Sequence, residues 1–136
     1  MLVRVKITDD LWIEQETEKE VDTFKALSRI QEVFKHDKCG KCQGSNVKFV
    51  CRKDKDENDW LEIVCKNPKC GCKLIFGQTK GKGGEIYPKV RWNNLSATQQ
   101  QQRADEEDYA NNHAGFLPNG GWFKYQGNYR EDEKSE

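Results

Sequence analysis

The sequence is poor in hydrophobic residues and contains no long hydrophobic run. Hydrophobic residues make up 35% of the 136 residues and charged residues 34%, whereas globular domains commonly have about 45–50% and about 25%. A large core is therefore not expected. No apolar stretch approaches the ~20 residues of a membrane-spanning helix, and no secretory signal follows Met1. We expect a cytoplasmic protein with no membrane partner.

Motifs of catalysis are also missing. Neither His36 nor His113 lies in an H-E-x-x-H segment, and the H-x-E of zinc deaminases does not occur. The glycine-rich segment at 77–83 has one residue too few between its glycines for a phosphate-binding loop. We therefore expect a protein that is not an enzyme.

The formal net charge of zero conceals a separation of charge along the chain. Residues 35–92 carry fourteen Lys or Arg and seven Asp or Glu, a net charge of +7. The flanking residues 1–34 and 93–136 carry net charges of −3 and −4. A basic centre favours a polyanionic partner such as nucleic acid, although a lysine-rich solvated surface has the same composition.

Hydrophobic periodicity predicts an α+β fold with a small antiparallel β-sheet and one packed helix. Alternating residues predict a hairpin of strands at 2–7 and 11–15. Phe24, Leu27, Ile30 and Phe34 recur at helical spacing, so we expect a helix over 22–35 whose apolar stripe packs on the sheet. Further strands are expected at 47–51, 60–64, 73–77, 85–87 and 90–92.

The composition changes after residue 92, so residues 1–92 are expected to form the single folded domain. Residues 93–114 include four consecutive glutamines and four consecutive acidic residues, which indicate a polar linker or a marginal helix outside the core. An aromatic box follows at 115–129. The acidic residues 130–136 are expected to be a disordered tail.

All six cysteines lie in the basic segment. Because structural disulfides are not expected in a reducing compartment, this number of cysteines indicates metal ligation. Cys39 and Cys42 form a C-x-x-C pair, and Cys65 and Cys70 form a looser second pair after a predicted hairpin. This is the plan of a zinc ribbon, here at 36–78. We expect these four thiolates to hold a structural Zn²⁺, because four cysteines leave no coordination position for water or substrate.

The fourth ligand has alternatives. Cys72 competes with Cys70, and Cys70 is preferred because it precedes a glycine, as in many second knuckles. His36, just before the first pair, is another possible ligand. Cys51 is expected to be a small core residue.

Cations and aromatic residues alternate after the ribbon. Lys80, Lys82, Lys89 and Arg91 surround Tyr87 and Trp92, and Trp60 offers a further ring. Such a mixture suits phosphate contacts and base stacking on single-stranded nucleic acid. The alternative is that the rings belong to the core and the lysines are only solvated.

Parts of the sequence resemble small zinc-ribbon proteins of bacteriophages that are encoded near recombination and replication genes. The shared motifs are Cys65, Cys70-Gly71, Lys73–Gln78, Gly84 to Lys89, Leu117–Asn119 and Gly121–Tyr125. The spacing from Cys65 to Cys70 and the presence of Cys72 depart from the commonest pattern, which leaves the fourth ligand open. The resemblance implies a zinc-containing, single-stranded-DNA-binding protein of the host cytoplasm.

The leading hypothesis is thus a non-enzymatic protein that binds single-stranded DNA in phage recombination or replication. Its acidic C-terminal tail would recruit recombination or replication proteins. The alternative is a zinc-ribbon interaction module that docks on a host or phage enzyme through the aromatic box. A third hypothesis is an accessory protein of transcription or replication that reads duplex nucleic acid.

Overall fold

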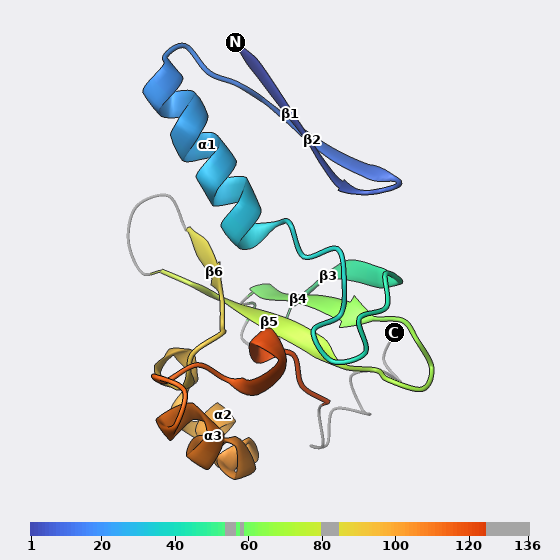
Figure 1. The fold of residues 1–136 in the computed structure, drawn as a ribbon, viewed down its shortest axis with the longest axis vertical. Helices are drawn as coiled ribbons and strands as arrows, with labels where there is room; N and C mark the ends of the chain where they lie inside the picture. Colours follow the sequence, from blue (N-terminus) through green and yellow to red (C-terminus); the bar gives the residue numbers. More distant parts are fainter. Residues whose placement is uncertain (54–56, 58, 80–84, 125–136) are drawn as a thin grey trace.

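Two antiparallel sheets and several short helices make up the fold, which confirms the predicted α+β class. The computed structural model describes residues 1–53, 57, 59–79 and 85–124. The first sheet and its helix lie at one end of the molecule, the second sheet lies in the middle, and the short helices lie at the other end (Figure 1). No helix in these ranges combines the length and apolar character needed to cross a bilayer. The predictions for Lys80, Lys82, the turn at 81–84 and the tail at 130–136 lie outside the described residues.

Strands β1 (Leu2–Thr8) and β2 (Leu11–Glu16) form the predicted N-terminal hairpin. Successive side chains of a strand point to opposite faces. Val3 and Ile7 therefore share one face of the hairpin, where they are buried against Ile30 of the following helix. The other face of the hairpin stays open to solvent.

Helix α1 (Glu20–Val33) begins and ends two residues earlier than predicted. It buries Ala26, Ile30 and Val33, whereas Phe24, predicted to pack on the sheet, is 75% exposed. A two-stranded hairpin covers only a narrow strip of a helix, and Phe24 lies about 120° around the helix from Ile30. The predicted stripe is therefore wrong in its N-terminal half and correct at Ile30.

The second sheet has four antiparallel strands in sequence order: β3 (Val47–Lys53), β4 (Asp59–Cys65), β5 (Lys73–Gln78) and β6 (Ile86–Pro88). The first three of these strands were predicted, and the fourth begins one residue later than expected. The strand predicted at 90–92 is wrong. Pro88 cannot donate to a sheet ladder, and beyond it Arg91 forms a single bridge to Phe116 while Trp92 begins the 3₁₀ turn η1 (Trp92–Asn94).

The segment at 93–114, predicted as a polar linker or a marginal helix outside the core, is folded into short helices. It contains α2 (Ala97–Gln102), η2 (Ala104–Glu106) and α3 (Glu107–Asn111). Ser96 begins α2 with a capping box, in which its hydroxyl accepts from the Gln99 N–H over 3.2 Å. Leu95, Arg103 and Ala110 are buried. These three buried residues are too few and too far apart in the sequence to show as a helical hydrophobic pattern. The polar composition between them therefore predicted, wrongly, that the segment lies outside the core.

The aromatic box after residue 115 belongs mostly to the core. Leu117 and Trp122 are buried, and Phe123 is half-buried and pairs with the first residue of β5. The turn η3 (Pro118–Gly121) connects these anchors. Phe116 is exposed, at 42%. Of the box predicted at 115–129, residues 125–129 lie outside the described residues.

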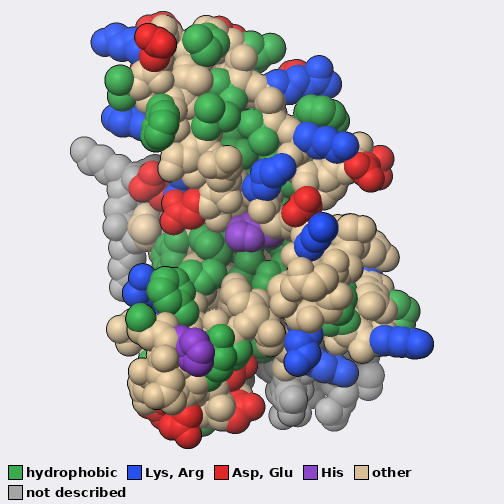
Figure 2. All heavy atoms as spheres, viewed as in Figure 1, with side chains coloured by type: hydrophobic (Ala, Val, Ile, Leu, Met, Phe, Trp, Pro, Cys, Tyr) green, Lys and Arg blue, Asp and Glu red, His purple; other side chains and the backbone are tan. Residues whose placement is uncertain are grey.

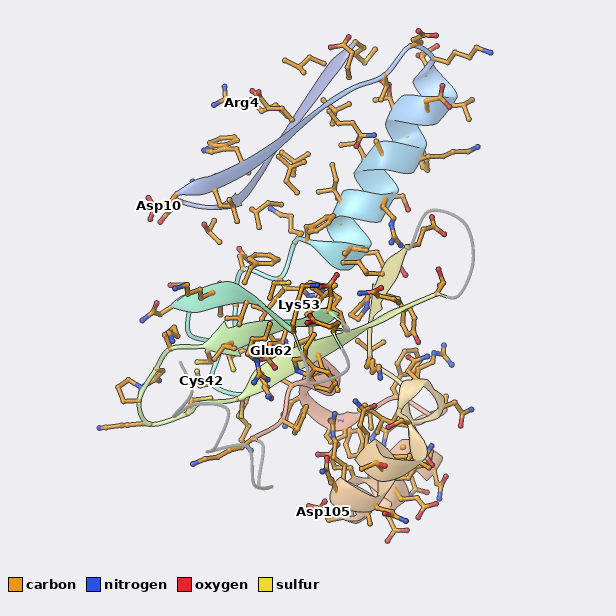
Figure 3. The ribbon with its side chains drawn as sticks, turned by 180° about the vertical axis from the view of Figure 1, so that it is seen from behind. Arg4, Asp10, Cys42, Lys53, Glu62 and Asp105 are labelled. Carbon is orange, nitrogen blue, oxygen red and sulfur yellow. The ribbon has the colours of Figure 1, made fainter. Side chains whose placement is uncertain are left out.

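A buried ion cluster ties the second sheet together. The carboxylate of Glu62 on β4 is 5% exposed and lies 2.8 Å from Lys73 Nζ of β5 and 3.3 Å from Arg52 Nη2 of β3. Trp60 Nε1 donates to the same carboxylate over 3.1 Å. Glu62 thus joins three adjacent strands through its side chain (Figure 3).

Candidate metal centre and nucleic-acid interface

Four cysteines from two loops converge beside the second sheet. Cys39 and Cys42 lie in the loop between α1 and β3, Cys65 ends β4, and Cys70 lies in the loop before β5. Their sulfur atoms all lie within 4.8 Å of one another. The distance is 3.6 Å for Cys39 to Cys70 and 3.6 Å for Cys42 to Cys65. The sulfur atoms are yellow in Figure 3, where Cys42 is labelled.

The first cysteine loop is closed by its own backbone. The Cys39 N–H donates to the Gly44 carbonyl over 2.9 Å, and Gln43 takes a positive φ of 63° to make the turn. Two further N–H groups point at sulfur, from Lys41 to Cys39 Sγ at 3.3 Å and from Gly44 to Cys42 Sγ at 3.4 Å. Such donors stabilise negative charge on thiolates, so the loop is arranged for ionised cysteines.

The four sites differ in how readily they ionise without a metal. Burial raises the pKa of Cys39, and it raises the pKa of Cys65 to about 12. Burial also acts to raise the pKa of Cys70, but hydrogen bonds from the Cys72 backbone and neighbouring thiols outweigh it and lower the value to about 7. A cation among them would offset the cost of ionising the two buried thiols.

The geometry fits a tetrahedral metal ion. Four thiolates at metal–sulfur distances of about 2.3 Å lie about 3.7 Å from one another, close to the two observed separations of 3.6 Å. The donor set is four sulfur atoms, the set found in structural Cys₄ sites. The four cysteines predicted as ligands are therefore placed where they could hold one ion.

The other candidate ligands do not belong to this group of four, although Cys72 lies in the same buried cluster as Cys39, Cys65 and Cys70. Cys72 is buried in the core beside Trp122, and its carbonyl accepts from the Cys65 N–H over 2.8 Å. His36 Nε2 lies 2.9 Å from the Glu32 carbonyl and its ring meets Phe76 edge-on. Neither residue belongs to the cysteine group that the described ranges bring together.

Cys51 corrects another prediction. It was expected in the core, but it is exposed on β3. Phe49, on the same face of that strand, packs in the cluster of the first sheet and α1, and Cys51 does not belong to that cluster. Cys51 therefore lines an open apolar groove of about 190 Å³ together with Phe34 and Leu61.

Five lysines lie in the two cysteine loops or on the strand that follows the first loop, and we call them the lysine rim: Lys38, Lys41, Lys48, Lys66 and Lys69. All five are exposed. Within the described part of the chain, none of them forms an ion pair. Figure 2 shows Lys and Arg side chains at the lower right, where Figure 1 places these loops. The residues predicted to contact phosphates lie between 80 and 91, and none of these five lysines was among them.

The cations predicted to bind nucleic acid are divided in the structure. Lys89 is half-buried, its Nζ donates to Gln99 Oε1 over 2.8 Å, and desolvation lowers its pKa. Arg91 is exposed, and its guanidinium carbon lies 4.0 Å above the centre of the Phe116 ring. Of these two, Arg91 is thus the one that is free to meet a ligand.

The predicted stacking residues are partly covered. Trp60 and Trp92 are half-buried and pack against the Ile75, Leu95 and Leu117 core. Tyr87 lies across Gly77, where an added Cβ would come within 2.6 Å of the tyrosine ring. Tyr109 and Phe116 are exposed aromatic residues in the described part of this end, and neither was predicted as a stacking residue.

The short helices that carry Tyr109 also carry acidic side chains. Asp105, Glu107 and Asp108 are exposed on η2 and α3. Figure 2 shows acidic side chains gathered at the bottom, where these helices lie in Figure 1. The acidic residues that follow position 93 thus gather on these short helices.

Comparison with known proteins gives no relative. No family model matches the chain, and neither the curated proteins nor the solved structures contain a match.

Proposed function

We propose that this chain is a zinc-ribbon protein that binds single-stranded DNA and catalyses no reaction on it. The observation that carries the proposal is the lysine rim, five exposed cations without ion-pair partners in the described ranges, around four converging thiolates. The motifs that resemble phage zinc-ribbon proteins support the same function and suggest recombination or replication as its setting. Partners of the acidic tail would then be other proteins of those processes.

Zinc is the metal that fits this donor set. Zn²⁺ takes four thiolates in a tetrahedron and needs no further ligand. Held by Cys39, Cys42, Cys65 and Cys70, it would fasten the loop before β3 to the loop before β5. Its role would be structural, because binding free energy at such sites is folding free energy.

The lysine rim carries more charge than the metal site requires. A Zn²⁺ ion with four thiolates has a net charge of −2, which five lysine cations exceed. The remaining positive charge faces solvent and would attract phosphates, releasing the counterions condensed on the nucleic acid. This electrostatic contact does not read sequence.

A single strand is favoured over a duplex by the exposed Arg91–Phe116 pair. The guanidinium can reach a phosphate while the ring offers a face to an unstacked base. Bases of a duplex are already stacked on each other and cannot use such a ring. The pair is a short, separate surface and adds to the contacts made at the lysine rim.

The direct test is a binding titration with a labelled oligo(dT), the matching duplex and an RNA of the same length, each at two salt concentrations. Wild-type protein should bind the single-stranded DNA most tightly. The double variant Lys66→Gln with Lys69→Gln should bind more weakly and lower the salt slope by about 0.7 for each lost phosphate contact. A matched control replaces Lys19 and Lys25, two exposed lysines near the start of α1, and should keep the wild-type slope. If the protein binds none of the three nucleic acids, the proposed function is refuted.

A protein-docking module is the second candidate, and one observation favours it. Among the residues that the structure describes, seven of the nine exposed large hydrophobic residues lie within the first 27 positions: Met1, Leu2, Leu11, Trp12, Val21, Phe24 and Leu27. Exposed apolar surface of this kind is common at protein interfaces. Hydrophobic side chains are visible across this end of the molecule in Figure 2. A defined partner whose binding is lost in Phe24→Ser, with DNA binding unchanged, would support this candidate.

A further inference from the structure

A cavity of about 570 Å³ lies between the first cysteine loop, the short helices and the end of the aromatic box. Its volume is within the range of about 300–1,000 Å³ that is usual for small-molecule sites. Neither the metal centre nor the Arg91–Phe116 pair occupies it. The residues that line it combine positive charge, aromatic surface and polar side chains.

Two cations stand at the cavity. Lys41 from the lysine rim and Lys124 at the end of the aromatic box are exposed, and neither has an ion-pair partner in the part of the chain described. Because Lys41 belongs to both surfaces, a strand lying on the rim would pass the entrance of the cavity. Asp105 is an exposed carboxylate in the same lining. Because it repels anions, the anionic group of a ligand would lie beside the two lysines and away from Asp105.

The floor holds a buried arginine that lacks one partner. Arg103 is 4% exposed on its side chain, lies 3.8 Å above the Phe123 ring and binds Glu106 Oε1 at 2.7 Å. It also donates from Nη2 to the Gly121 carbonyl over 3.3 Å, whereas its Nη1 is buried and has no hydrogen-bond partner among the described residues. An unsatisfied buried donor is costly. Because Nη1 is itself closed to solvent, a ligand in the cavity would meet the Arg103–Glu106 ion pair and not this donor.

Flat and polar surfaces complete the lining. Tyr109 is 41% exposed and its ring is held by stacking on His113, with centroids 3.7 Å apart and planes within 6°. The Gln102 amide can both donate and accept, and Asp105 only accepts. A ligand with a planar ring, hydrogen-bonding edges and a negative group matches these features together.

We propose that this cavity binds one nucleotide, with the base against Tyr109 and the phosphate beside Lys41 and Lys124. The inference rests on the proposed function, because the bound single strand would supply the nucleotide. The rest of the strand would follow the lysine rim. One base would then leave the stack and enter a defined site, while its neighbours are held only through their phosphates.

The test uses the full-length, zinc-loaded protein and dAMP as the probe, followed by amide NMR shifts at millimolar dAMP. Shifts should concentrate at Gln102, Tyr109 and the loop of Lys41. Replacing Tyr109 and Gln102 together by alanine should weaken dAMP binding about fivefold or more, the effect of losing one stacked base. Trp12→Ala, an aromatic residue of similar exposure on the hairpin, should leave dAMP binding unchanged. Lys124→Gln, at an exposed position where folding is not at risk, should weaken binding of dAMP but not of the uncharged nucleoside.

Absence of shifts at these amides would overturn the inference, and so would equal dAMP affinity in wild type and the double variant. An oligo(dT) titration of the same samples separates the two proposals. Failure of the wild type to bind oligo(dT) would count against the proposed function. Normal oligo(dT) binding without cavity shifts, and without loss in the double variant, would defeat the nucleotide site alone.

Discussion

Gly40 of the first cysteine loop lies directly against Trp122 of the aromatic box. A Cβ on Gly40 would come within 2.6 Å of Trp122 Cδ1 and would also collide with the Asn119 carbonyl. Gly40, which lies between Cys39 and Cys42, and Trp122 are about eighty residues apart in the sequence but are in direct contact. The metal centre and the C-terminal box are one packed unit.

Gly40→Ala should therefore destabilise the protein by about 1–3 kcal/mol, the usual cost of overpacking. Backbone atoms of η3 would have to move to admit the methyl group. The measurement is equilibrium denaturation with zinc present. Lys41→Ala, at the next and exposed position, should stay within about 0.5 kcal/mol of wild type. Equal stability of the two variants would show that the contact is not tight in solution.

Serine variants should sort the six cysteines into two classes. Cys39→Ser, Cys42→Ser, Cys65→Ser and Cys70→Ser should each lose tight zinc binding, because each removes one of the four converging thiolates. Cys51→Ser and Cys72→Ser should keep one zinc per chain. Metal content after dialysis measures this directly. If Cys70→Ser keeps its zinc and Cys72→Ser loses it, the fourth ligand is Cys72 and not Cys70.

Zinc affinity should fall steeply as the pH is lowered. The pKa of Cys65 is about 12 and that of Cys39 is raised, so both thiols are protonated in the metal-free protein at neutral pH. The metal-bound state holds fewer protons, and its formation is favoured at higher pH. With at least two protons released, the dissociation constant should rise about 100-fold for each unit of pH lost. Competition with a chromophoric chelator at several pH values gives the slope. A slope of one proton or less would contradict this.

Glu62→Gln should be among the more damaging single substitutions. It removes the buried carboxylate that Lys73 and Arg52 approach, and breaking a buried ion pair costs about 3–5 kcal/mol. Glu14→Gln is the control, because Glu14 pairs with Arg4 at 3.4 Å on the exposed hairpin face and exposed pairs contribute about 0–1 kcal/mol. Urea denaturation of both variants makes the comparison. Similar losses of stability in the two variants would show that burial of Glu62 does not strengthen its ion pairs.

Local patterns predicted the strands and the helix well because each pattern is complete within a few residues. The alternation around Val3 and Ile7 and the run from Lys73 onward depend on near neighbours. The convergence of Cys39, Cys42, Cys65 and Cys70 was predictable for the same reason, since two short pairs joined by a hairpin have few ways to meet.

Errors arose where folding depends on distant partners. Leu95 is buried only because Ile75 and Leu117, from two other segments, meet it. Phe24 has a helical spacing suited to burial, but no element in the described part of the chain covers it. The lysine rim combines residues from both sides of β3 and β4, so its charge density could not be read from any one stretch of sequence.

The attachment of the N-terminal hairpin has a consequence for how the molecule opens. Strands β1 and β2 pair only with each other, and they join the rest through a small cluster around Val3, Ile7 and Ile30 that reaches Phe49 of the second sheet. Metal binding fastens loops of the second sheet and leaves this cluster untouched. The hairpin should thus exchange its amide hydrogens through a partial unfolding that spares β4 and β5. Added zinc would slow exchange in the ribbon strands and leave the hairpin amides at their former rate.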